Sequence, residues 1–187
     1  MTPKKILDFL GVAEKLKSVL RHSWTSTGRQ ESVAEHSWRL CVFAWLLKHK
    51  FPDIDMDKVI RMCLFHDLGE ALTGDIPSFK KTDGDEHDEK KAISRILGML
   101  DEDLRTELEA LFREMEEQKT REARLYKTLD KLEAVIQHNE APLETWIPLE
   151  YELNVTYADD NVKGNPFLEE LREQIRKDTL AKIAVGK

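Results

Sequence analysis

Hydrophobic residues recur every three or four positions along most of the chain, which is the spacing of an amphipathic α-helix. Residues that cap helix N-termini, or prolines that fit a first turn, precede most of these stretches. The expected helices begin at or near Thr2-Pro3, Ser32, Asp55 or Asp57, Glu86, Asp101, Thr120 and Asn165-Pro166. Because only 8 Gly and 6 Pro are available for turns, the pattern predicts an all-α fold, a helical bundle of about six to eight helices.

Two polar stretches interrupt the pattern and predict loops, Arg21 to Glu31 and Asn154 to Gly164. The first contains several side chains of types that contact ligands: Arg21, His22, Trp24 and Arg29. The helix that begins near Asp55 is expected to end at Gly74, because glycine fits the left-handed residue that closes a helix.

No internal repeat, low-complexity tract or linker divides the sequence. Its 187 residues fit one ordinary domain. We therefore predict a single domain over residues 1–187, with its motifs between about residues 16 and 140 and a C-terminal helix from about residue 166 to 184.

Composition and charge narrow the function classes. The net charge of −7 argues against binding of nucleic-acid polymers or anionic membranes, although a small phosphate ester remains possible where a metal ion and arginines reverse the local field. No run of apolar residues is long enough to span a membrane, and the N-terminus lacks the apolar core of a signal peptide. Cys41 and Cys63 fall within apolar helical patterns, which predicts reduced thiols and a cytoplasmic protein.

The segment Cys63–Asp75, CLFHDLGEALTGD, carries the densest chemistry in the chain. His66 and Asp67 follow an apolar run, Glu70 comes one helical turn later, and Asp75 closes the segment. Burying such groups is costly unless they are paired or bind a metal. This cost is the first indication of a functional site.

Four residues of metal-ligand type lie within apolar patterns on three different predicted helices: His36, His66, Asp67 and Asp130. Two imidazoles and two carboxylates suit a borderline divalent ion such as Mn, Co, Fe, Ni or Zn better than Ca or Mg. Four protein ligands in an octahedral shell leave about two positions for water and a substrate oxygen. Adjacent helical residues point about 100° apart, so His66 and Asp67 can share an ion only if it lies between helices.

The order His36, His66-Asp67 and Asp130 resembles the pattern of the HD superfamily of metal-dependent phosphohydrolases. The segments ESVAEHS at 31–37 and HDLGEALTGD at 66–75 are similar to its 5′-deoxynucleotidase branch. The similarity extends from about Leu16 to Glu140.

This resemblance implies hydrolysis of a phosphomonoester, with a (2′-deoxy)nucleoside 5′-monophosphate as the small-molecule substrate. Arg21 matches in position an arginine of the branch, which would hold the phosphate by charge-assisted hydrogen bonds. Glu70 would accept or relay the proton of the attacking water, and Asp75 would orient the nucleophile or protonate the leaving oxygen. Trp24 would contact the base or sugar, but it follows Arg21 only after His22 and Ser23, a departure from the branch that leaves the choice between deoxyribose and ribose open.

Other interpretations of the same residues stand beside this one. A second His-Asp pair, His87-Asp88, lies in the charged run DGDEHDEKK and predicts only a solvated helix start. Glu70 could pair with a lysine, Asp75 could cap the next segment, and Asp130 could pair with Lys127 or Lys131. The rival functions are an HD-type hydrolase of diesters, nucleoside triphosphates or pyrophosphorylated nucleotides, and a non-catalytic metal-binding regulatory protein.

The segment Leu143–Leu153 is apolar within a charged region and, with the last helix, predicts an exposed interface. Its expected surface residues are Trp146, Ile147, Leu149 and Tyr151. Because members of the resembled branch are commonly dimeric, we predict a homodimer.

Overall fold

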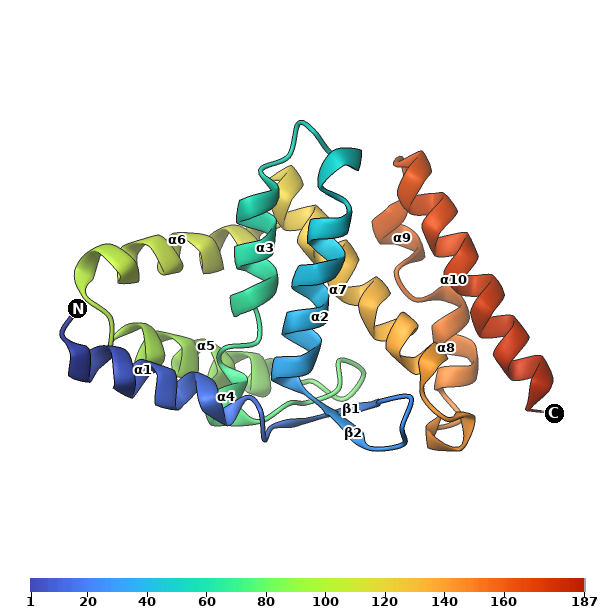
Figure 1. The fold of residues 1–187 in the computed structure, drawn as a ribbon, viewed down its shortest axis with the longest axis horizontal. Helices are drawn as coiled ribbons and strands as arrows, with labels where there is room; N and C mark the ends of the chain where they lie inside the picture. Colours follow the sequence, from blue (N-terminus) through green and yellow to red (C-terminus); the bar gives the residue numbers. More distant parts are fainter. Residues whose placement is uncertain (187) are drawn as a thin grey trace.

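Three helices, α2 (Val33–Leu46), α3 (Met56–Phe65) and α7 (Arg121–Glu140), lie side by side at the centre of the computed structural model, which describes residues 1–186 (Figure 1). Their facing side chains form most of the main core, and fully buried members include Leu40, Val59, Met62, Leu129 and Leu132. The apolar stripes predicted from the sequence therefore meet one another, while polar side chains gather near the start of α2, the end of α3 and the middle of α7.

The other elements flank this centre on two sides (Figure 1). On one side lie α1 (Pro3–Lys15), α4 (Glu70–Thr73), α5 (Asp83–Leu97) and α6 (Glu102–Glu117). On the other lie α8 (Glu150–Thr156), α9 (Asp159–Val162) and α10 (Pro166–Val185), and short 3-10 turns occur at Lys48–Lys50 and Leu143–Thr145. Within residues 1–186, eight α-helices have seven or more residues, which confirms the predicted helical bundle.

Most predicted helix starts are confirmed by their capping geometry. The start expected near Glu86 lies three residues earlier, because a capping box of Thr82 and Asp85 begins α5 at Asp83. The side chains of Thr2, Asp55, Thr120 and Asn165 each accept a hydrogen bond from the backbone N–H three residues later. Ser32 forms a reciprocal capping box with Glu35 at the start of α2. Each cap satisfies a backbone donor that a helix leaves unpaired at its N-terminus.

The loop predicted for Arg21 to Glu31 is wrong. This stretch forms most of an antiparallel hairpin of β1 (Leu20–Trp24) and β2 (Gln30–Ser32), and Gly28, with φ near +83°, completes its turn. The strands escaped notice because they carry mostly polar residues, some of which line a cavity, so the alternation that marks an amphipathic strand is missing.

The helix expected to reach Gly74 ends earlier. α3 ends at Phe65, His66 is its C-terminal cap, and a separate turn of helix, α4, precedes Gly74. Gly74 has the expected positive φ of 80°, but its ψ of 166° is extended rather than left-handed helical. This break turns the chain directly after His66, which lets His66 and Asp67 approach the same point.

The loop predicted for Asn154 to Gly164 is also wrong, because α8 and α9 occupy most of it. Asn154 and Val162 are buried there, and α10 packs against both short helices. Trp146, predicted to be exposed, is buried and donates a hydrogen bond from Nε1 to the carbonyl of His138 at 2.9 Å.

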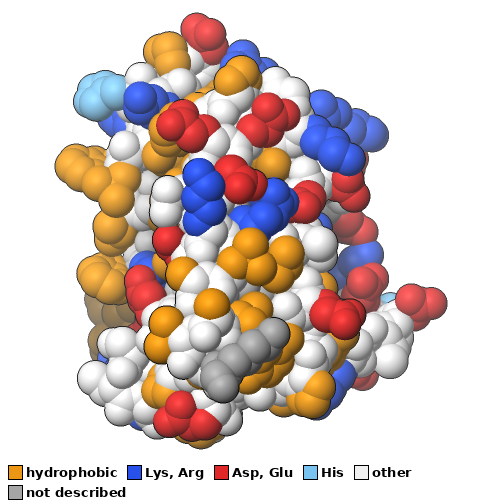
Figure 2. Space-filling model, turned by 90° about the vertical axis from the view of Figure 1, so that its right-hand side faces the viewer, with side chains coloured by type: hydrophobic (Ala, Val, Ile, Leu, Met, Phe, Trp, Pro, Cys, Tyr) orange, Lys and Arg blue, Asp and Glu red, His pale blue; other side chains and the backbone are white. Residues whose placement is uncertain are grey.

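The surface differs from one side to another. Figure 2, which faces the side formed by α8 to α10, shows acidic and basic side chains mixed with small hydrophobic areas, and hydrophobic side chains gather along its left edge.

Among the described residues, no helix combines the length and the apolar character that crossing a membrane requires. Both cysteines are free thiols, and Cys63 is buried.

Candidate metal centre and the cavity beside it

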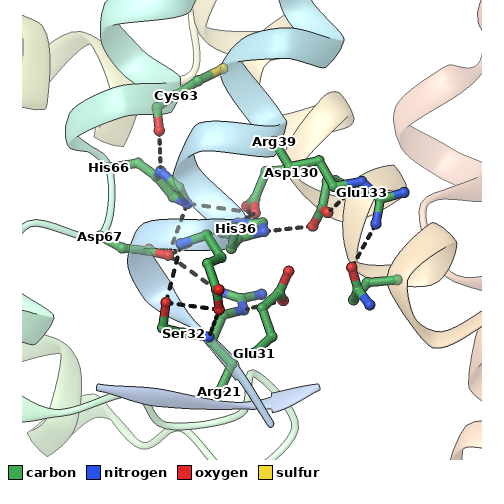
Figure 3. A network of polar contacts seen from close by, with 12 residues as sticks. Arg21, Glu31, Ser32, His36, Arg39, Cys63, His66, Asp67, Asp130 and Glu133 are labelled. Carbon is green, nitrogen blue, oxygen red and sulfur yellow. Dashed lines mark hydrogen bonds and ion pairs between the residues drawn. The ribbon is translucent and has the colours of Figure 1, made fainter. Parts of the chain in front are cut away.

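His36 and His66 face each other at the lower ends of α2 and α3 (Figure 3). Their rings lie 5.3 Å apart between centroids, and both side chains are buried. His36 Nδ1 lies 2.5 Å from Oε2 of Glu133, and His66 Nδ1 lies 2.9 Å from the carbonyl oxygen of Cys63. Because a carboxylate and a carbonyl only accept, both rings donate through Nδ1 and direct the Nε2 lone pair toward the space between them.

Asp67 and Asp130 bring carboxylate oxygens to that same space. Oδ2 of Asp67 lies 2.9 Å from His66 Nε2 and 4.0 Å from His36 Nε2. Oδ1 of Asp130 lies 3.3 Å from His36 Nε2 and 3.7 Å from His66 Nε2, while its Oδ2 accepts from Lys127 at 2.8 Å. The structure thus brings together all four residues that the sequence predicts as a metal-ligand set.

A divalent cation fits this arrangement. Neither buried Nε2 atom has a hydrogen-bond partner among the described residues. Two such nitrogens surrounded by carboxylate oxygens are costly unless something satisfies them. Ligand atoms of His36, His66 and Asp67 lie within 4.8 Å of one another, and Asp130 approaches from α7. In addition, the Nδ1 contacts fix ring orientation, as they do in known metal sites.

A cavity of about 380 Å³ opens beside these residues, within the roughly 300–1,000 Å³ typical of small-molecule sites. Arg21 rises into it from β1, with Nη1 3.3 Å from Asp67 and 3.8 Å from Asp75. Glu70, at the start of α4, is buried and also lines it, and its Oε2 has no hydrogen-bond partner among the described residues. The three non-ligand groups Arg21, Glu70 and Asp75 therefore share the cavity with the candidate centre.

Trp24, the fourth of these predicted residues, lies elsewhere. Among the described residues, those that line the large cavity include His22 and Ser23 but not Trp24. Trp24 instead borders a narrow crevice near Trp146, and its carbonyl accepts a hydrogen bond from Gln137 at 2.6 Å.

Comparison with known proteins bears directly on this geometry. Residues 13–172 match the model of the family described as HD domain. The chain belongs to the HD-domain family. Human 5′-deoxynucleotidase HDDC2 is 36% identical over 141 residues, which cover 73% of this chain and 68% of the human protein. Dictyostelium discoideum 5′-deoxynucleotidase HDDC2 is 33% identical over 185 residues, covering 92% of this chain and 97% of the relative.

A similar solved structure extends the comparison beyond sequence. The predicted metal-dependent phosphohydrolase from Magnetospirillum magnetotacticum MS-1 superposes with a TM-score of 0.80 at 27% identity, covering 96% of this chain and 93% of that one. The resemblance inferred from the sequence motifs is thereby confirmed, and with it the all-α HD-domain fold.

Charge interactions within the centre are strong. Burial opposes ionisation of Asp67, but His66 and Arg21 outweigh it and hold its pKa below the usual range. Burial and Arg21 disfavour protonation of His36, yet Glu133 and Asp130 raise its pKa to about 9. A site that stabilises protons on imidazole also stabilises a cation, because both respond to the same surrounding carboxylates.

The pKa of Glu70 is raised, in contrast to that of Asp67. Burial, reinforced by the negative charges of Asp67 and Asp75, raises the pKa of Glu70 to about 10. Burial also raises the pKa of Asp75, against the effect of Arg21. A cation beside these carboxylates favours their ionised forms, so metal binding and deprotonation of Glu70 are coupled.

Sequence reasoning missed two buried acids of this HD-domain centre. Glu133 contacts His36, as described, and Glu31 lies 3.5 Å from Nε of Arg21. Burial and Glu133 raise the pKa of Glu31 to about 7. Glu133 follows Asp130 by three positions in the same apolar stripe, so the argument applied to Asp130 would have found it. Glu31 lies in a polar stretch and carried no comparable signal.

Proposed function

We propose that this chain is a metal-dependent 5′-nucleotidase that releases phosphate from (2′-deoxy)nucleoside 5′-monophosphates. The relatives named 5′-deoxynucleotidase support the reaction class, since two of them are 33% and 36% identical to this chain. The observation that carries the proposal is the pair of unpartnered imidazole nitrogens facing two carboxylates, with an arginine beside them in a nucleotide-sized cavity.

In this proposal His36, His66, Asp67 and Asp130 hold one divalent ion. When bound, the ion supplies Lewis-acid polarisation of a phosphate oxygen and a lowered pKa for the attacking water. The imidazole and carboxylate ligand set favours Mn, Co, Fe, Ni or Zn over Ca and Mg.

The chain's own side chains perform the remaining steps. Arg21, held by Asp67 and Asp75, donates hydrogen bonds to the phosphate. Glu70 takes the proton of the attacking water, because its carboxyl is buried at the cavity wall and has a free oxygen. Asp75, which lines the cavity with a carboxylate oxygen 3.8 Å from Nη1 of Arg21, orients the nucleophile or protonates the departing 5′-oxygen.

The test is a phosphate-release assay on chelator-treated protein reloaded separately with Mn, Co, Fe, Ni or Zn. We expect turnover of 2′-deoxynucleoside 5′-monophosphates that depends on added metal, with ribonucleotides measured alongside. Absence of phosphate release with every metal would contradict the proposal, and hydrolysis confined to diesters or triphosphates would assign the chain to another HD-type reaction.

We also propose that residues 1–187 form a single domain. Support comes from the main core, which joins helices as distant in sequence as α2 and α10 through Leu40, Leu129 and Ile175. Limited proteolysis that yields two separately folded fragments would contradict it.

A homodimer remains our prediction for the assembly, although its surface must be revised because Trp146 is buried. Leu149 and Tyr151 are still exposed, but a larger hydrophobic area lies on α2, where Trp38 and Trp45 are 67% and 62% exposed. Light scattering across micromolar concentrations tests this prediction. The prediction of a cytoplasmic location rests on the two free thiols, and cell fractionation would test it.

A further inference from the structure

A second group of polar side chains lines the same cavity away from the candidate metal centre. Glu150, at the start of α8, is only 2% exposed. Its Oε1 lies 3.2 Å from Nε2 of His22 and 3.4 Å from Nδ1 of His138. Asn154, one turn further along α8, places Nδ2 3.2 Å from Nδ1 of His138. Elements far apart in sequence, β1, α7 and α8, thus meet at one carboxylate.

This carboxylate is held firmly but is not satisfied. Oε2 of Glu150 accepts a hydrogen bond from the backbone N–H of Ile147 at 2.8 Å, which fixes the orientation of the group. Oε1 has no partner with hydrogen-bond geometry among the described residues, although both histidines lie close. A buried carboxylate oxygen without a full set of donors is costly, and a ligand with an N–H or O–H group would remove that cost.

Helix α7 sets the distance between the two ends of the cavity. Asp130, Ala134 and His138 all line it and follow one another at intervals of four residues, so they share one face of the helix. Eight residues of helix span about 12 Å, which separates a candidate metal ligand from His138. The small side chain of Ala134 leaves space between them. This span accommodates a phosphate at Asp130 and the rest of a nucleotide extending toward His138.

We propose that Glu150, positioned between His22 and His138, recognises the nucleoside end of the substrate by accepting a hydrogen bond from it on Oε1. The inference rests on the proposed nucleotidase function and adds the residues that select the substrate. The donor is either an N–H group of the base or a hydroxyl of the sugar, which present the same chemistry to a carboxylate.

The test compares Glu150→Gln with the wild-type chain on a panel of 2′-deoxynucleoside 5′-monophosphates and on 2-deoxyribose 5-phosphate, which lacks a base. The glutamine keeps an oxygen for Ile147 but presents an NH₂ donor to the cavity in place of the acceptor. A hydrogen bond to a charged group predicts a loss of about 10- to 100-fold in kcat/KM. The loss should appear in KM, with kcat nearly unchanged, because the contact forms in the ground state as well as the transition state.

The substrate without a base separates the two donors. A loss confined to the nucleotides assigns Oε1 to a base N–H, and an equal loss on 2-deoxyribose 5-phosphate assigns it to the sugar; both support the inference. Unchanged KM on every substrate overturns it and leaves a purely structural network. Glu152→Gln is the matched control, since Glu152 is exposed on the same helix and should change neither constant.

A second variant guards against loss of folding in Glu150→Gln. His22 lies on the hairpin with part of its side chain exposed, so His22→Ala should fold while removing one of the two imidazoles that lie beside Oε1 and bound the space in which the nucleoside end would bind. We expect a rise in KM of about 3- to 10-fold for the substrate class that responds to Glu150, and an unchanged KM would overturn the inference. A wild-type chain that releases no phosphate at all would refute the proposed function instead, and this result precedes any comparison of variants.

Discussion

The chain contains two His-Asp pairs, His66-Asp67 and His87-Asp88, and the structure gives them opposite surroundings. The first lies directly after α3, with His66 buried and Asp67 mostly covered. The second lies within α5, where both side chains are exposed. Asp88 forms an ion pair with Lys91 at 3.0 Å, a surface contact of small energetic value.

The difference shows what converts a dipeptide into a candidate site. His66 follows an apolar run that buries it, and the end of α3 supplies the Cys63 carbonyl that fixes its ring. Facing helices then add His36 and Asp130 within 4 Å of the His66-Asp67 pair. His87 lies in a charged run without an apolar flank, and both His87 and Asp88 are exposed, so the same two residue types remain solvated.

The largest effect expected from this comparison concerns metal and turnover. His66→Ala and Asp67→Ala should each lower bound metal sharply, and loss of the metal's contribution, worth several kcal/mol, should reduce phosphate release by more than about 10³-fold. His87→Ala is the matched variant and should change neither quantity. Elemental analysis and a phosphate assay measure both. Stoichiometric metal in His66→Ala would contradict the assignment of the ligands.

Glu70 separates chemistry from metal binding at the buried pair. Glu70→Ala should retain metal and fold, because all four proposed ligands remain, but should lower kcat by about 10²–10⁴ through loss of one acid–base group. Glu107→Ala, on the exposed face of α6, serves as control and should keep normal turnover. Near-normal turnover in the Glu70 variant would remove the acid–base assignment while leaving the metal site standing.

Much of this organisation was predictable from local sequence. Ser32, Thr120 and Asn165 mark helix starts, because their side chains satisfy backbone N–H donors within three residues. Such capping can be predicted from the local sequence alone. Asp130 was likewise visible, since an acid within an apolar stripe must find a partner. The four proposed ligands share one property in the sequence, a polar side chain of metal-ligand type within an apolar pattern.

What escaped prediction depends on partners distant in sequence. The hairpin at Leu20–Ser32 is mostly polar, and Arg21, His22 and Ser23 line a cavity formed largely by other elements, so its own pattern does not reveal strands. Glu150 could not be recognised as a candidate binding residue from its own segment, because the histidines beside it, His22 and His138, lie in β1 and α7. Trp146 is of a residue type common in interfaces, yet its side chain is buried and its indole N–H donates a hydrogen bond to the carbonyl of His138.

Substitution of Glu133 tests whether metal binding requires the ring orientation of His36 as well as its presence. Glu133→Gln removes the charge that favours Nδ1–H on His36 and allows the amide to reverse the hydrogen bond, which presents the wrong tautomer. Metal affinity should fall by about 10- to 100-fold, as is usual for partners of metal-binding histidines. Titration of chelator-treated protein with metal measures it. Glu140→Gln, at the exposed end of α7, should leave the affinity unchanged, and an equal effect of both variants would contradict the argument.

The smallest predicted effect is the pH dependence of stability in metal-free protein. The fold raises the pKa of His36 to about 9, and burial raises that of Glu70 to about 10. Both shifts favour the protonated form, so their stabilisation is complete below the unfolded pKa values and is lost as the pH rises through 9 and 10. The free energy of unfolding should therefore fall by roughly 1–3 kcal/mol between pH 7 and 8 in the presence of a chelator. Saturating metal should reverse the sign, because metal binding requires deprotonated ligands and strengthens as protons leave.

Denaturant unfolding at several pH values, with chelator or metal, measures both slopes. Glu70→Gln should flatten the slope of stability against pH in the metal-free protein, and His87→Gln, at the exposed His-Asp pair, should leave it unchanged. An equal change of slope in both variants would contradict the difference between the buried centre and the exposed pair.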